Sequence, residues 1–219
     1  MTDANTNAHP HTEADPDTGT GTGTDAANTS TGAGTETETD GSTTTTRKAS
    51  RTGLPLAAAV LTGTVALYIA LVAFGNITDF GTNQQFVRHV LAMDTTFKDP
   101  DLMWRAITSH PLQDAAYVAI IVWETLAALV LIAATALWTV ALRRGGDLAR
   151  AQRTSTLGLL MILVLFGAGF MAVGGEWFAM WQSETWNGLE AAARNVTVAG
   201  ITLVVVHLPA RSGRRGGGQ

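Results

Sequence analysis

An aromatic and acidic segment between Gly174 and Gly188 contains the residues of this sequence that are best suited to binding. It reads GGEWFAMWQSETWNG and holds three of the six tryptophans of the chain. Tryptophan rings with fixed polar groups beside them can hold a lipid headgroup, a small amphipathic ligand or a partner helix. The alternative is a membrane-interface belt, where tryptophan is common. The residues that we predict to form the binding surface are Glu176, Trp177, Met180, Trp181, Gln182, Trp186 and Asn187.

Two charged residues lie inside otherwise apolar stretches. Glu124 lies about nine residues, or ~14 Å at the helical rise, below the outer end of the apolar stretch 115–142. Arg194 lies about five residues, ~8 Å, below the outer end of the stretch 189–208. A charge at the bilayer centre costs about 2.5–3.5 kcal/mol on insertion scales, so we expect Glu124 to be protonated, paired or facing a wet cavity. An intramembrane Glu124–Arg194 pair is one prediction. The alternatives are local pairing of Arg194 with Glu190, or its extension to the membrane interface.

The stretch between Asn76 and Asp114 is less apolar and predicts two short helical faces. Apolar residues recur at spacings of three and four from Phe86 to Phe97, which is typical of a helix lying on a membrane surface or across a bundle mouth. Asp99-Pro100-Asp101 should end that helix, and His110-Pro111 should open the next. The candidate polar and aromatic residues here are Asn76, Asp79, Arg88, His89, Asp94, Trp104 and Arg105.

Motifs for catalysis or metal binding are missing from the sequence. No two histidines stand three or four residues apart, and cysteine is absent, so thiolate chemistry and disulfides are excluded and we predict no metal site. There is no glycine-rich phosphate loop, nucleophile elbow or triad, so we predict no catalytic residues and expect a non-enzymatic protein. The cofactor question stays open, although the apolar stretches offer no histidine pair for haem.

Four apolar stretches are long enough to cross a bilayer, which needs about 20 helical residues. They span about residues 54–75, 115–142, 155–173 and 189–208. The first and third carry no charge on any face, whereas helices of a soluble bundle would show a polar stripe. The sequence therefore predicts an all-α, four-helix transmembrane bundle with the lipid bilayer as its surroundings.

Basic residues predict the orientation of these spans. They precede the first span, lie between the second and third, and follow the fourth; they are Arg47, Lys48, Arg51, Arg143, Arg144, Arg150, Arg153, Arg211, Arg214 and Arg215. The positive-inside rule then places both termini in the cytoplasm and both intervening loops outside. We expect a multi-pass protein of the inner membrane.

The ends of the chain differ in composition from the four-span domain at residues 51–210. Residues 1–50 contain eight acidic against two basic residues and are rich in threonine and glycine. Such a segment buries too little apolar surface to offset the entropy of ordering, so we predict a disordered cytoplasmic tail. Residues 211–219 form a basic, glycine-rich cytoplasmic tail.

Three strings carry a family resemblance: NITDFGTNQQFVRHVLAMDTTF, WRAITSHPLQDAAYVAIIVWETL and GGEWFAMWQSETWNGLEAAAR. Over roughly residues 55–208 the chain resembles small bacterial integral membrane proteins known as domain of unknown function 2165. The resemblance implies four transmembrane helices in one domain and an inner-membrane location, and it implies no activity. The residues in the matching strings are Asn76, Asp79, Phe80, Asn83, Phe86, His89, Met93, Asp94, Trp104, Arg105, Glu124, Glu176, Trp177, Met180, Trp181, Trp186, Asn187 and Arg194.

Two classes of function fit these features. The first is a membrane protein whose aromatic outer loops bind a lipid, an apolar ligand or a partner subunit, the partner being another membrane protein or a second copy of the chain. The alternative is a membrane-embedded proton, ion or electron-transfer component that uses Glu124 and Arg194. We expect no nucleic-acid partner in either case.

Overall fold

The computed structural model describes residues 42–209, with side chains described from residue 53, and every regular element in that range is helical. Five α-helices occur, joined by two single-turn 3₁₀ helices, η1 and η3, and by one π-helix, η2, that continues α4. Their bounds are α1 Ser42–Thr78, α2 Phe80–Ala92, η1 Met103–Arg105, α3 His110–Arg144, α4 Leu148–Leu163, η2 Val164–Trp177, η3 Met180–Gln182 and α5 Leu189–His207.

Four helices are long and apolar enough to cross a membrane, as predicted, but their ends differ from the prediction. They cover Gly53–Thr78, His110–Arg144, Leu148–Trp177 and Leu189–His207. The second starts at His110, five residues before its apolar stretch, which confirms the prediction that His110-Pro111 opens this helix, because Pro111 suits the first helical turn. The third also starts early, because Asp147 accepts hydrogen bonds from the first free backbone N–H groups of α4.

The predicted terminal tails lie mostly outside the described residues. Residues 1–41 and 210–219 are not described, whereas α1 begins at Ser42, inside the segment predicted to be disordered. A helix that has formed in an apolar stretch adds preceding residues at low cost, since nucleation is already complete.

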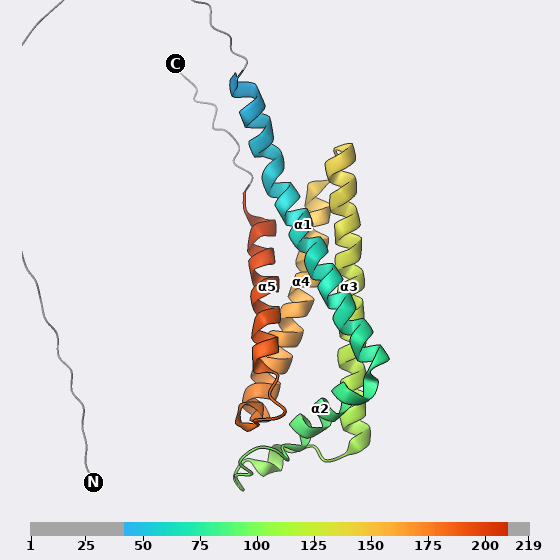
Figure 1. The fold of residues 1–219 in the computed structure, drawn as a ribbon, viewed down its shortest axis with the longest axis vertical. Helices are drawn as coiled ribbons and strands as arrows, with labels where there is room; N and C mark the ends of the chain where they lie inside the picture. Colours follow the sequence, from blue (N-terminus) through green and yellow to red (C-terminus); the bar gives the residue numbers. More distant parts are fainter. Residues whose placement is uncertain (1–41, 210–219) are drawn as a thin grey trace, which may run out of the picture. The chain divides into compact units, whose positions relative to one another are not determined.

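The four long helices pack in a ring. α1 contacts α3 and α5, and α4 also contacts α3 and α5, while α2 packs on α3 at one end of the bundle (Figure 1). We call that end the loop end; it comprises residues 79–109, which include α2, and residues 178–188. α2 lies across the bundle at this end rather than along it, as predicted for the helix between the first two spans (Figure 1).

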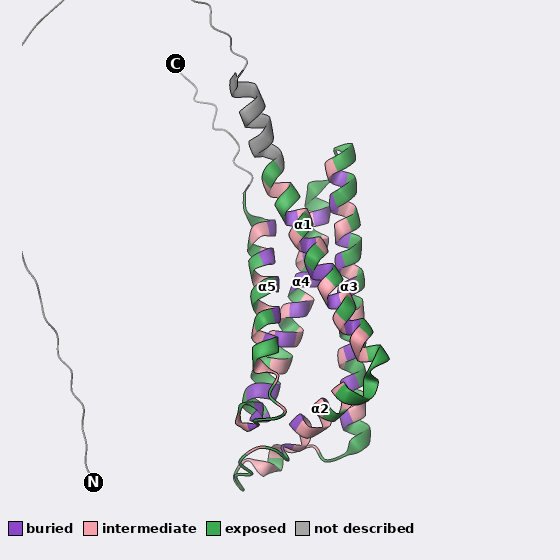
Figure 2. Ribbon diagram, viewed as in Figure 1, coloured by how far each residue is buried: buried purple, intermediate pink, exposed green. Residues whose placement is uncertain are grey.

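Close packing of the ring depends on small residues. Residues 0–3 % exposed, such as Ala66, Ala127 and Ala199, face the bundle interior. Gly158 of α4 lies directly against Leu131 of α3, where a Cβ atom would come within 2.6 Å of Leu131 Cγ. Large apolar side chains on the outer faces, such as Leu67, are exposed, and Figure 2 shows buried residues along the inward faces of the helices. This is the pattern of helices that meet through small residues and face lipid with large ones.

The π-helix η2 carries the glycine-rich part of the third span. Its closing hydrogen bond runs from Phe178 N to Val173 O at 3.0 Å, which is the i to i+5 pattern. The wider turn places residues four and five apart on one face, so Leu165, Gly169 and Phe170 of η2 all line the same space. π-helical segments occur often at functional sites.

Candidate functional site

An ion pair fixes α2 to the start of α3. Arg88 Nε and Nη2 donate to the two carboxylate oxygens of Asp114 at 2.9 and 2.8 Å, and Gln84 Nε2 donates to Asp114 Oδ1 at 2.9 Å. These hydrogen bonds raise the pKa of the Arg88 guanidinium above its ordinary value, so it stays charged. The two-pronged geometry sets the direction of α2 as well as its position.

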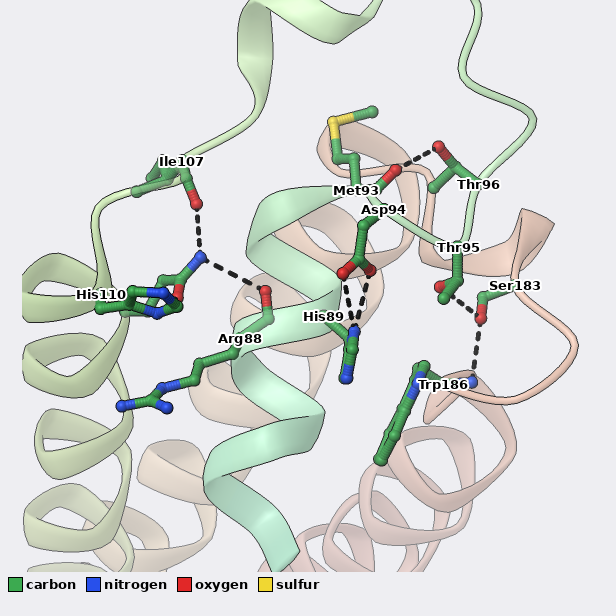
Figure 3. A network of polar contacts seen from close by, with 11 residues as sticks. Arg88, His89, Met93, Asp94, Thr95, Thr96, Ile107, His110, Ser183 and Trp186 are labelled. Carbon is green, nitrogen blue, oxygen red and sulfur yellow. Dashed lines mark hydrogen bonds and ion pairs between the residues drawn. The ribbon is translucent and has the colours of Figure 1, made fainter. Parts of the chain in front are cut away.

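Buried Gln113 ties the loop between α2 and α3 to the same helix start. Its Nε2 donates to the carbonyl oxygen of Ile107 at 2.7 Å and to that of Arg88 at 3.4 Å. Its Oε1 lies 3.2 Å from His110 Nδ1. Figure 3 shows the Ile107 and Arg88 carbonyls facing this position from two different segments. The amide therefore holds the segment after α2 against α3.

Ser183 joins the second loop to the first. Its Oγ lies 2.8 Å from Thr95 Oγ1 and accepts a hydrogen bond from Trp186 N at 2.9 Å (Figure 3). Beside it, His89 Nδ1 lies 2.8 Å from Asp94 Oδ2. Ser183 is 4 % exposed, so its two hydrogen bonds are shielded from water, whereas the contact of His89 with Asp94 is exposed.

The loop tryptophans contact the first loop. Trp186 stacks on the His89 ring at a centroid distance of 4.6 Å. Trp181 meets Phe97 edge to face at a centroid distance of 5.9 Å. Phe97 is more than half exposed, and Trp181 is about half exposed. Neither Trp181 nor Trp186 lines either of the two cavities described below. Their density in the sequence is accounted for by packing between the loops.

Arg105 packs against two tryptophan rings that also contact each other. Its guanidinium carbon is 4.9 Å from the ring centroid of Trp177 and 5.6 Å from that of Trp104, and the two rings meet edge to face at 5.5 Å. Nη1 donates to the Trp177 carbonyl oxygen at 3.4 Å. This cation–π contact fastens η1 to the end of η2.

An apolar cavity of about 330 Å³ lies beneath α2, between α3 and η2. All of its fourteen lining residues are apolar: Phe86, Val87, Val90, Leu91, Ala116, Ala119, Ile120, Leu165, Gly169, Phe170, Val173, Gly174, Phe178 and Met180. Ala119, Gly169 and Val173 are exposed on the outer surface of the bundle. The cavity therefore reaches the surface between α3 and η2, where the apolar spans face lipid.

A second cavity, of about 260 Å³, is lined by residues of α1, α2, α3, η2 and α5 and contains polar groups. Its polar side chains are Tyr68, Asn76, Asn83, Tyr117, Glu124 and Asn195, and no lysine, arginine or histidine lines it. We call it the polar cavity, and the first one the apolar cavity.

Glu124 is 2 % exposed and is held by the end of α1. Asn76 Nδ2 donates to its Oε2 at 2.6 Å, and Tyr117 OH donates to the Asn76 carbonyl oxygen at 3.0 Å. Among residues 53–209, Asn76 is the one side chain that donates a hydrogen bond to this carboxyl group. Glu124 lines the polar cavity, and its Oε1 accepts no hydrogen bond from the described residues.

Asn195 of α5 is 5 % exposed and presents an unpaired oxygen. Its Nδ2 donates to the Ala191 carbonyl oxygen at 2.8 Å, which fixes the amide orientation because a carbonyl can only accept. Oδ1 is buried and has no hydrogen-bond partner. A buried acceptor left unpaired costs about 1–3 kcal/mol, so this oxygen marks a place where a donor would be stabilising.

Two phenyl rings stand between the cavities. Phe86 of α2 and Phe170 of η2 stack at a centroid distance of 6.4 Å with an interplanar angle of 14°, and both residues line both cavities. Gly188 makes room for the first of them, since a Cβ there would come within 2.8 Å of Phe86 Cζ.

The predicted Glu124–Arg194 pair does not form in the described part of the chain. Arg194 is exposed; among the described residues an ion pair joins Arg88 to Asp114, and a hydrogen bond joins His89 to Asp94. The reason is helical geometry. Asn195 faces the polar cavity, and the preceding residue is turned about 100° away from it around α5. The local pair with Glu190 is also absent, and extension of Arg194 to the membrane interface stays a prediction.

The other predicted site residues are dispersed around the loop end. Glu176 and Trp177 belong to the last turn of η2 rather than to the connector, because the π-helix continues through them. Met180 is buried and lines the apolar cavity. Three side chains stabilise backbone or local turns: Gln182 Oε1 accepts from Phe97 N at 3.0 Å, Asn187 Oδ1 from Leu189 N at 3.1 Å, and Asp79 Oδ1 from Thr82 Oγ1 at 2.9 Å.

Sequence reasoning missed several residues that build the cavities. Asn195, Tyr117 and Phe170 were not singled out as site residues, nor was Gln113 as a structural one. A usable signal exists for Asn195, which is a lone amide in an apolar span. Within the described residues no three histidine, aspartate or glutamate side chains come close enough together to hold a metal ion.

Four apolar helices around a core of small residues define a multi-pass integral membrane protein. The chain belongs to the family described as "predicted small integral membrane protein" (domain of unknown function 2165), whose model matches residues 54–209. No curated protein and no solved structure matches the chain.

Proposed function

We propose that this protein is a membrane-embedded binding protein for a small amphipathic molecule, whose apolar part enters the apolar cavity from the lipid phase. The observation that carries the proposal is a cavity of about 330 Å³ with an entirely apolar lining that reaches the lipid-facing surface. This volume is at the lower end of the range of about 300–1,000 Å³ for ligand pockets, which suits a short alkyl chain or one ring system.

The loops act as a cover for this cavity in our proposal. Four residues of α2 line its roof, and Phe178 and Met180 close it from the second loop. The Ser183–Thr95 hydrogen bond and the stacking of Trp186 on His89 hold these two covers together, and the ion pair of Arg88 with Asp114 holds α2 on α3. The aromatic loops thus serve binding indirectly, by shaping the cavity, rather than through the exposed tryptophan rings.

We place the loop end on the outer side of the inner membrane. Four arginines lie at the opposite end, around the turn between α3 and α4, and basic loops stay in the cytoplasm. In this orientation the cavity opens into the outer half of the bilayer, and its ligand is a molecule that partitions there.

The test is photolabelling of the full chain in phosphatidylcholine liposomes with decanol that carries a diazirine on its chain. We expect saturable labelling of peptides that contain Leu165, Phe170 and Met180, and we expect excess plain decanol to compete with it. Excess plain decanol should not reduce the labelling of lipid-facing peptides, because the bulk lipid around them does not saturate.

A pair of variants separates the cavity from the surface of α3. Ala116→Trp places an indole in the apolar cavity, and Ala133→Trp places one on an exposed position of the same helix outside it. We expect the first to abolish the competed labelling and the second to leave it unchanged. Equal labelling in both variants would overturn the proposal.

A further inference from the structure

The polar cavity indicates which polar group the ligand carries. Both cavities share Phe86, Val87, Ile120 and Phe170 in their walls, so a molecule held in the apolar cavity lies one side chain away from Glu124 and Asn195. The inference rests on the proposed function, since it concerns the other end of the same ligand.

The hydrogen bonding of the polar cavity calls for a donor. Glu124 Oε1 has no protein donor among the described residues, and Asn195 Oδ1 is buried and unpaired. Asn76 already supplies the one amide that reaches the carboxyl group. Glu124 and Asn195, which carry these two acceptors, both line a cavity of about 260 Å³, which leaves room for a small group with several N–H or O–H bonds.

The charge of the polar cavity calls for a cation. Its lining contains one acid and no basic residue, so an ionised Glu124 lacks a counter-charge from the protein there. Burying an unpaired carboxylate is costly, and a cation brought by a ligand removes that cost. The same charge balance disfavours phosphate and carboxylate groups, which would face Glu124 without any positive partner.

Aromatic rings in the walls favour the same kind of group. The rings of Tyr68, Tyr117 and Phe166 line the polar cavity together with the Phe86 and Phe170 pair. Ring faces attract ammonium groups, and the attraction is larger when water is excluded. A cavity lined by one carboxylate and several aromatic rings therefore favours an ammonium group over a hydroxyl group of similar size.

We propose that the polar cavity binds the ammonium group of an amphipathic amine, with the Glu124 carboxylate as its counter-charge and Asn195 Oδ1 as a hydrogen-bond acceptor. The alkyl part of the amine occupies the apolar cavity. Phe86 is the side chain that has to turn to let the molecule span both spaces. Its ring lies against Gly188 on one side and also contacts the rings of Phe170 and Trp186.

The test compares decylamine with decanol as competitors of the photolabelling reaction, each corrected for its partitioning into the liposomes. At pH 7 we expect decylamine to halve the labelling at a concentration roughly tenfold or more below the concentration of decanol that does so. The reason is that charge-assisted hydrogen bonds are about twice as strong as neutral ones. Glu124→Gln should bring decylamine to the level of decanol and leave decanol unchanged. Asn195→Leu should weaken decylamine by a smaller factor.

Glu190→Gln is the matched control, because Glu190 is an exposed acid on α5 that lines neither cavity. Unchanged decanol competition in Glu124→Gln shows that this variant is folded; if it does not fold, Asn195→Leu carries the test. Equal competition by decanol and decylamine in the unaltered protein would overturn the ammonium assignment and leave the proposed function intact. Absence of saturable labelling by the decanol probe would overturn the proposed function itself.

Discussion

Replacing Gly158 by alanine tests the packing of α3 on α4. The new Cβ would lie 2.6 Å from Leu131 Cγ, 2.7 Å from Leu131 Cδ2 and 3.2 Å from Val130 Cγ1. Leu131 is fully buried, so it cannot move aside without disturbing the core. Overpacking of this kind costs about 1–3 kcal/mol. The higher helix propensity of alanine offsets about 1 kcal/mol, so we expect a net loss of about 0–2 kcal/mol in the free energy of unfolding.

Gly200→Ala is the matched control for this substitution. Gly200 lies inside α5, and a Cβ there would meet no atom within 4 Å. We expect this variant to be as stable as the unaltered protein or more stable by up to about 1 kcal/mol. The free energy of unfolding is measured by titration with sodium dodecyl sulfate in mixed micelles. If Gly158→Ala proved as stable as Gly200→Ala, α3 and α4 could not be packed as described.

Two further predictions concern the loop end. Ser183→Ala should lower the free energy of unfolding by about 1 kcal/mol and speed proteolysis of the first loop, because Thr95 and the Trp186 N–H lose a buried partner; unchanged proteolysis would show that the two loops are not joined there. Single-cysteine variants test the orientation without background, since the chain has no cysteine. In intact cells an impermeant maleimide should label Asp101→Cys and not Arg150→Cys, and the opposite pattern would reverse the orientation.

The helices were predictable from the sequence because membrane spans follow from the length of apolar runs. All four expected spans are present. Two of them begin before their apolar stretch, the third after the N-cap Asp147 and the second with Pro111 in its first turn. The surface helix was also predictable, since Val90 and Met93 are buried as their spacing requires. Phe97 is not buried, because α2 ends at Ala92 and the chain leaves the bundle there.

The site was less predictable because it depends on rotation about the helix axes. The depths of Glu124 and Arg194 along their spans predicted that they meet. The rotation of α5 about its axis instead brings Asn195 to the polar cavity and turns Arg194 outward. The π-helix changes the facing of residues after Val164, and a single sequence gives no rule for where such a segment begins. Composition therefore identified a polar group inside the membrane but not its partner, Asn76.

The most direct test of the central claim is to map, residue by residue, where the diazirine decanol attaches in the full chain in liposomes. We predict competed attachment on the apolar-cavity faces of η2 and α2, at residues such as Phe170 and Val90, and its loss in Ala116→Trp. Competed attachment confined to the exposed rings of Trp104 and Trp181, and unaffected by Ala116→Trp, would contradict binding in the cavity and return the site to the loop surface.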